Sequence, residues 1–158
     1  MANAAEWWFY HIEHTALDAA IAPLIEKCLE RKWRVVLVAH EETLVRLDRA
    51  LWTLRDESFI PHGRARTDAA KHPVLLSTEA VATNGAKVAL LLDGSDADPA
   101  AFERIMVMFD GADETARAKA RQQYKAATDA GAPARYFQQE SGGGWKERTP
   151  TKKDASSE

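Results

Sequence analysis

Apolar runs alternate with helical patterns along this chain, and that alternation most constrains its fold. Residues 34–39 (Arg-Val-Val-Leu-Val-Ala) form an apolar run typical of a central strand covered on both faces. The pattern predicts an α/β fold with a mostly parallel sheet and helices on both faces. The other strands are expected at Glu6–Ile12, Pro73–Ser77, Lys87–Leu92, Arg104–Phe109 and Ala134–Gln138.

Three helices are expected between these strands. We expect Thr15 to cap the first, with Asp18 three residues on as the acid of a capping box. The second covers Leu44–Leu54, where leucines recur at three- and four-residue spacing and mark one buried stripe. The third runs from about Asp113 to Ala130, with Gly131 at its C-terminal cap position.

Length and composition predict one domain. With 158 residues, 46% of them hydrophobic, the chain is long enough to bury a substantial core. Residues 1–140 are expected to form a single α/β domain. Residues 141–158 lack apolar periodicity, so a flexible C-terminal tail is expected there.

Net charge, cysteine content and hydropathy restrict the binding partners and the cellular compartment that we expect. A formal net charge of −3 argues against a surface built as a whole to hold duplex DNA, although it leaves room for a small basic patch. The single cysteine, Cys28, cannot form an internal disulfide, which favours a reducing cytoplasm. Because no run of about 18 apolar residues occurs, membrane insertion is not expected.

The sequence contains no motif for a cofactor or a metal. Neither G-x-G-x-x-G nor G-x-x-x-x-G-K-[ST] is present, so no nucleotide cofactor is expected. His11 and His14 flank Glu13, but on an extended strand His14 would point away from the other two. No metal site is therefore expected.

Two strands end in the same way, at Leu91-Leu-Asp-Gly94 and Met108-Phe-Asp-Gly111. Carboxylates at the carboxyl ends of parallel strands are typical of metal-dependent phosphoryl chemistry. Asp93 and Asp110 are thus the candidates for an enzyme, a metal-dependent phosphotransferase or hydrolase. Asp-Gly is also a common turn, and we favour that interpretation.

The last helix carries a basic face. Arg117, Arg121, Tyr124 and Lys125 lie at positions i, i+4, i+7 and i+8, and no acid occurs from residue 116 to residue 128. Acids from neighbouring elements or an anionic partner would each compensate these cations. Because Tyr124 adds a flat apolar surface, we favour an acidic peptide that ends in an aromatic residue, whose carboxylate an arginine can grip.

Two aromatic residues lie at the end of the second helix and in the loop after it. Trp52 lies at the edge of the leucine stripe, and Phe59 lies in a polar stretch ahead of Pro61. They either cap the core or contact a partner chain.

The segments Leu47-Asp-x-Ala-Leu-Trp52, Glu57-Ser-Phe-Ile-Pro-His62 and Ala120-Arg-Gln-Gln-Tyr-Lys125 resemble the chi subunit family of bacterial DNA polymerase III. The resemblance runs from Phe9 to Gly131 and implies a Rossmann-like, non-catalytic accessory subunit attached to the clamp loader.

The resemblance also implies two binding surfaces. Arg117, Arg121, Tyr124 and Lys125 would bind the acidic C-terminal tail of the single-stranded-DNA-binding protein. Trp52, Phe59 and Pro61 would contact the psi subunit, another clamp-loader subunit or a helicase-like protein. No sequence-specific nucleic-acid contact is expected.

Overall fold

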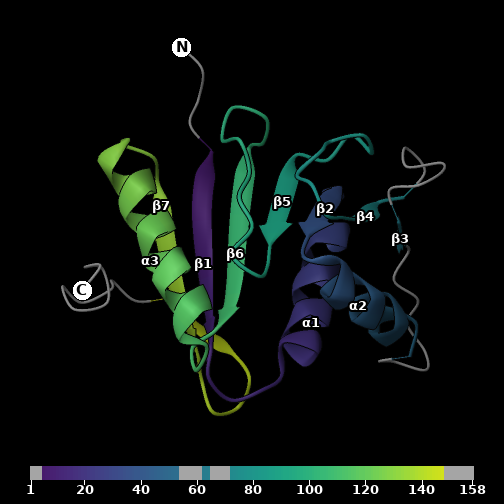
Figure 1. The fold of residues 1–158 in the computed structure, drawn as a ribbon, viewed down its shortest axis with the longest axis horizontal. Coiled ribbons are helices and arrows are strands. Elements are labelled where there is room, and N and C mark those ends of the chain that lie inside the picture. Colours follow the sequence, from purple (N-terminus) through teal and green to yellow (C-terminus); the bar gives the residue numbers. More distant parts are fainter. Residues whose placement is uncertain (1–4, 54–61, 65–71, 148–158) are drawn as a thin grey trace.

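The described part of the chain folds around one eight-stranded sheet (Figure 1). The computed structural model describes residues 5–53, 62–64 and 72–147. The strands are β1 (Glu6–Ile12), β2 (Val35–Val38), β3 (His62–Arg64), β4 (Val74–Ser77), β5 (Val88–Leu91), β6 (Arg104–Asp110), β7 (Ala134–Gln139) and β8 (Trp145–Glu147).

The strand order confirms the predicted α/β class. It is β3-β4-β2-β5-β6-β1-β7-β8, and every neighbouring pair is parallel except β7 with β8. All four residues of β2 are buried, as the apolar run at residues 34–39 predicts. β2 lies between β4 and β5, inside the sheet.

Helices cover both faces of the sheet: α1 (Leu17–Glu30), α2 (Glu41–Thr53) and α3 (Glu114–Asp129). Successive side chains of a strand point to opposite faces, and β1 shows the division. Tyr10 and Ile12 belong to the apolar cluster that includes α1 and α2. Trp7 and Phe9 belong to the cluster that includes α3. The expected arrangement of helices on both faces is therefore confirmed.

The expected N-cap of the first helix is wrong. The cap is Ala16, and its side chain makes no capping hydrogen bond. The Oγ1 of Thr15 instead accepts a hydrogen bond from Nε2 of Gln139, at 2.9 Å. The Oε1 of Gln139 accepts from the backbone N–H groups of Glu13, His14 and Thr15. A glutamine from β7 thus holds the entry to α1, a partner that local sequence spacing does not reveal.

The sheet also continues past residue 140, where the sequence placed the end of the domain. Glu140 donates its backbone N–H to the carbonyl of Gly144, and Gly143 donates to Glu140. This glycine turn connects β7 to β8, and the two strands pair antiparallel. In their register Phe137 lies opposite Glu147 and Gln139 lies opposite Trp145. The expectation of a flexible tail is wrong for 145–147, because the glycines form a hairpin rather than a linker. Residues 148–158 lie outside the described residues.

The predicted end of the last helix matches the structure. Ala130 is the C-cap, and Gly131 follows in the left-handed region at φ 78°. Gly131 donates its N–H to Thr128, and Ala132 donates to Ala127, which together form a Schellman motif.

Candidate functional site

The candidate binding face lies on α3, which the sequence predicts correctly in extent. Asp113 caps the helix by accepting a hydrogen bond from the N–H of Ala116 at 3.1 Å. Ala120, Gln123 and Ala127 are buried. The arginines are half-buried and Lys125 is exposed, so this face is open to a partner.

Two of the cations on α3 are held by acids. Lys119 lies 2.7 Å from Asp96, and Lys125 lies 3.1 Å from Asp129, one turn on. Burial opposes ionisation of Asp96, but hydrogen bonds from Lys119 and Gln123 hold the pKa of its carboxyl below the usual range. Part of the basic face is therefore compensated within the protein, one of the two interpretations that the sequence left open.

Arg117 and Arg121 differ from these two lysines in their ion pairing. Among the described residues, no carboxylate forms an ion pair with Arg117 or Arg121. The Nε of Arg121 is buried and has no hydrogen-bond acceptor in that part of the chain. A buried donor without an acceptor costs about 1–3 kcal/mol.

Tyr124 provides a fixed apolar surface next to these cations. Its ring meets the edge of Phe9 at 5.4 Å between centroids and that of Tyr136 at 6.2 Å. The ring is half-buried and packs on the cluster beneath α3. The Tyr124 ring is therefore held in place, one turn from Arg121 on the same helix.

A crevice opens at the carboxyl edge of the sheet, between β1 and β6. β1 continues into α1 on one face of the sheet, whereas β6 continues into α3 on the other face. In open α/β sheets such a switch point is where ligands bind. The crevice has a volume of about 500 Å³ and is lined by His11, Ile12, Glu13, His14, Asp110, Gly111, Ala112, Arg117 and Gln138.

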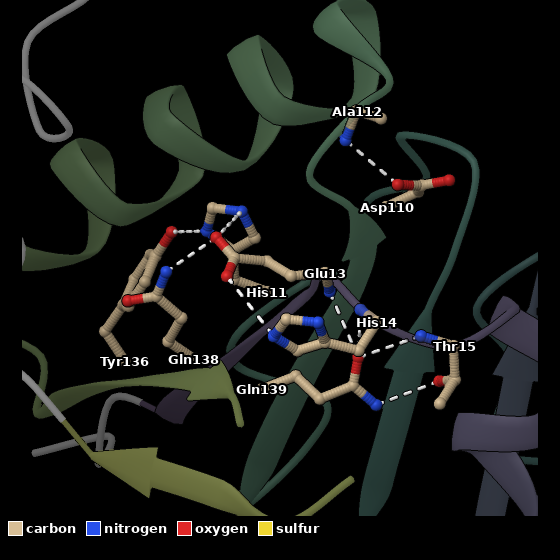
Figure 2. Close-up of polar contacts among 9 residues, drawn as sticks. All are labelled: His11, Glu13, His14, Thr15, Asp110, Ala112, Tyr136, Gln138 and Gln139. Carbon is tan, nitrogen blue, oxygen red and sulfur yellow. Dashed lines mark hydrogen bonds and ion pairs between the residues drawn. The ribbon is translucent and has the colours of Figure 1, made fainter. Parts of the chain in front are cut away.

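Hydrogen bonds and ion pairs link the polar side chains at this crevice (Figure 2). The Nδ1 of His11 shares a 2.6 Å hydrogen bond with the hydroxyl of Tyr136. The Nε2 of His11 lies 3.5 Å from Glu13, which also accepts a 2.6 Å hydrogen bond from Gln138. The expectation that His14 points away from Glu13 is wrong, because their side chains approach to 3.9 Å beyond the end of β1.

Gly111 is required by the packing of His11. A Cβ at this glycine would lie 2.1 Å from Nε2 of His11 and 3.1 Å from the carbonyl oxygen of Ile12. Since real Cβ contacts are essentially never as short as the first of these, only glycine lets the histidine ring lie against the end of β6.

The two strand-end aspartates serve separate turns. Asp93 accepts a 3.0 Å hydrogen bond from the N–H of His40 at the end of β2. Asp110 accepts a 2.9 Å hydrogen bond from the N–H of Ala112 in its own turn. The described residues contain no group of three or more His, Cys, Asp or Glu side chains placed to hold a metal ion.

The expected partner-subunit surface is only partly covered by the structure. Trp52 lies in the last turn of α2, one residue after the buried Leu51. Phe59 and Pro61 lie outside the described residues. The role of all three in a partner interface stays a prediction.

Sequence reasoning missed two residues that support this site. Tyr136 contacts both His11 and Tyr124, and the buried Gln123 donates hydrogen bonds to Ser95 and Asp96. The spacing of glutamines on the helix gave no signal for Gln123. To predict the role of Tyr136, one would have to know that β7 lies beside β1.

The fold and the α3 face define a Rossmann-like α/β domain that carries a basic, tyrosine-containing helix. The profile of the DNA polymerase III chi subunit, HolC, matches residues 5–135. The chain therefore belongs to the DNA polymerase III chi subunit family.

A similar relative is the probable DNA polymerase III subunit chi of Rickettsia prowazekii (strain Madrid E). It is 31% identical over 91 residues, which are 55% of this chain and 54% of the relative. The chain thus spans about half the length of this curated relative. Within the described residues, no helix is both long and apolar enough to cross a membrane.

Proposed function

We propose that the protein is a non-catalytic accessory subunit of the DNA polymerase III holoenzyme that acts during DNA replication. It links the clamp loader to the single-stranded-DNA-binding protein by binding the acidic C-terminal tail of that protein. Membership of the chi family supports the assignment to the polymerase complex.

The observation that carries the tail-binding part is the state of Arg121. This half-buried arginine lies three residues from Tyr124 on a face where no described carboxylate pairs with either arginine. A peptide that ends in an aromatic residue would place its terminal carboxylate on Arg121 and its ring against Tyr124. Arg117 and Lys125 would attract the acidic residues that precede the terminus.

The second contact of the adaptor is proposed to involve Trp52, Phe59 and Pro61. Its partner is psi, another clamp-loader subunit or a helicase-like protein. Two weak contacts joined in one molecule raise the effective concentration of polymerase on coated single strands.

The test is fluorescence anisotropy of a labelled acidic peptide that ends in Asp-Phe, titrated with the full chain. Arg121→Glu is expected to weaken binding at least about thirtyfold, because truncating a charge pair costs roughly 2–5 kcal/mol. Arg121→Lys should give an intermediate affinity, since a lysine keeps the charge but loses the bidentate geometry.

Two controls make the result specific. Lys87→Glu introduces the same kind of charge change at an exposed lysine outside α3 and should leave the affinity nearly unchanged. A peptide without the terminal Phe should not saturate. Normal affinity in folded Arg121→Glu would refute the site.

A further inference from the structure

A second cavity lies on the opposite face of the sheet from α3. Its volume is about 590 Å³, within the ~300–1,000 Å³ typical of small-molecule sites. Its lining comes from β1, β7 and β8, from α1, and from the glycine turn at 142–144. It therefore shares no residue with the α3 face or with the crevice at the carboxyl edge.

Aromatic rings form the walls of this cavity, and neighbouring groups hold them in place. Tyr10 stacks on Phe137 at 5.1 Å, and Trp145 meets the edge of Tyr10 at 5.2 Å. The guanidinium of Arg104 lies between two indoles, 4.4 Å from Trp8 and 4.3 Å from Trp33. Trp8, Trp33 and Trp145 are only half-buried. Arg135 also lies over Trp8, and Arg31 over Trp33. Among the described residues no guanidinium lies over Trp145, so its ring is the one left for a planar ligand.

The charges around the cavity are of one sign. Its lining includes Lys27, Arg31 and Arg135 but no aspartate or glutamate. Arg135 is engaged by Glu147 of β8, whereas the described residues give Lys27 no ion pair. Lys27 and Arg31 lie one turn apart at the end of α1 and are exposed. In a chain with a net charge of −3, this local excess of cations favours an anionic ligand.

We propose that this cavity binds one nucleotide of a single-stranded nucleic acid without sequence preference. The base stacks on Trp145, and the flanking phosphates contact Lys27 and Arg31. Aromatic platforms beside cations are how proteins bind single strands irrespective of sequence, because every base has a π-face.

The distribution of the cations favours a strand over an acidic peptide. A peptide ending in an aromatic residue needs one strong carboxylate site beside one ring. Here the two exposed cations, Lys27 and Arg31, follow one another at the end of α1, and Arg31 also lies over the Trp33 ring at 5.1 Å. The indole rings come from three places, β1, β8 and the segment before β2. Repeating phosphates beside a base match this arrangement.

The test is anisotropy of a fluorescein-labelled oligo(dT), titrated with the full chain at several salt concentrations. With two phosphates neutralised, the logarithm of the affinity should fall with that of the salt concentration with a slope of about −1.4. The double variant Lys27→Gln, Arg31→Gln should lose this salt dependence and most of the binding. Lys87→Gln with Lys146→Gln, two exposed lysines outside the lining, should leave both unchanged.

A second variant tests the stacking. Trp145→Leu keeps an apolar side chain on β8 but removes the π-face, and it should weaken binding roughly five- to hundredfold. Circular dichroism and urea unfolding establish that each variant is folded. An unchanged affinity in the folded double variant would overturn the proposal.

Three further measurements distinguish the proposed site and ligand from the alternatives. Arg121→Glu should bind the oligonucleotide normally, and loss of binding there would move the strand to α3. Thymidine monophosphate should compete only at much higher concentration, and equal competition would make a free nucleotide the ligand. Binding of an acidic peptide that depends on Lys27 and Arg31, with no oligonucleotide binding, would overturn the proposal in favour of a peptide site.

Discussion

Cys28 shows how the fold changes the chemistry of a single side chain. This residue lies on the buried side of α1 and is 2% exposed. Burial raises the pKa of its thiol from the ordinary 9.0 to about 11, against the smaller opposing effects of Arg104 and Arg31. The thiol is therefore neutral near pH 7 and forms an uncharged part of the cavity lining.

This shift predicts a loss of stability in alkaline solution. Below about pH 9 the folded and unfolded chains both hold the proton, whereas between 9 and 11 the unfolded chain releases it first. Deprotonation then favours the unfolded chain, and the free energy of unfolding should fall by roughly 2–3 kcal/mol over that window. Urea unfolding from pH 8 to 11 measures it.

Cys28→Val is the matched control, since it keeps an apolar side chain and cannot ionise. Burial also raises the pKa of Tyr10, so a further loss begins above about pH 10 in both proteins. From pH 8.5 to 10 the variant should lose less stability than the wild type. Parallel curves in that interval would contradict the prediction.

At the scale of residues, the sequence predicted α3 and its basic face but not which acids would engage it. Asp129 and Asp96 pair with Lys125 and Lys119, and only the first lies on the same helix. The second pair depends on the tertiary fold. The two arginines that stay without a described carboxylate could not be distinguished from the two lysines by spacing alone.

At the scale of elements, the C-terminus of α3 gives a test of backbone strain. Gly131 has φ 78°, and a Cβ there would meet no atom within 4 Å. Gly131→Ala should therefore destabilise the protein by about 1 kcal/mol through the left-handed backbone alone. Urea unfolding measures the change.

Gly142 provides the comparison. A Cβ added to it would also meet no atom within 4 Å, but its φ is not in the left-handed region. Gly142→Ala is therefore expected to be neutral or slightly stabilising, because it restricts the unfolded chain. Equal losses in the two variants would show that strain at Gly131 is not the cause.

Most elements were predictable because their periodicity is local, and the errors occur where distant segments meet. The apolar runs located β1, β2 and β4 to β7 to within one or two residues. β8 was not predicted, because a strand of three residues is too short to show an alternation of apolar and polar side chains. Thr15 was assigned the wrong role because its partner, Gln139, is 124 residues away.

At the scale of the whole molecule, the helices that carry Trp52 and Arg121 lie near opposite edges of the sheet. α2 precedes β3 and β4 at one edge, whereas α3 packs over β1, β6 and β7 near the other (Figure 1). Sites that share no contacts act independently to within a few tenths of a kcal/mol.

Trp52→Ala is therefore expected to spare binding of the acidic peptide while weakening capture of the clamp-loader partner. Anisotropy measures the first, with the affinity expected within about twofold of wild type. Quantification of polymerase subunits retained from lysate on immobilised protein measures the second. Arg121→Glu should show the reverse pattern, and equal retention of subunits by Trp52→Ala and wild type would sink the interface.

The place of β1 in the sheet has a consequence for how the protein is made. β1 is the earliest of these strands along the chain, yet both of its partners come late. It pairs with β6, where Glu6 lies opposite Arg104, and with β7, where Trp7 lies opposite Ala134. On the ribosome, β2, β4 and β5 can pair before either partner of β1 has been translated. The aromatic segment Trp7-Trp-Phe-Tyr10 thus waits unpaired through most of synthesis, and the sheet closes around it only when the last helix and β7 emerge.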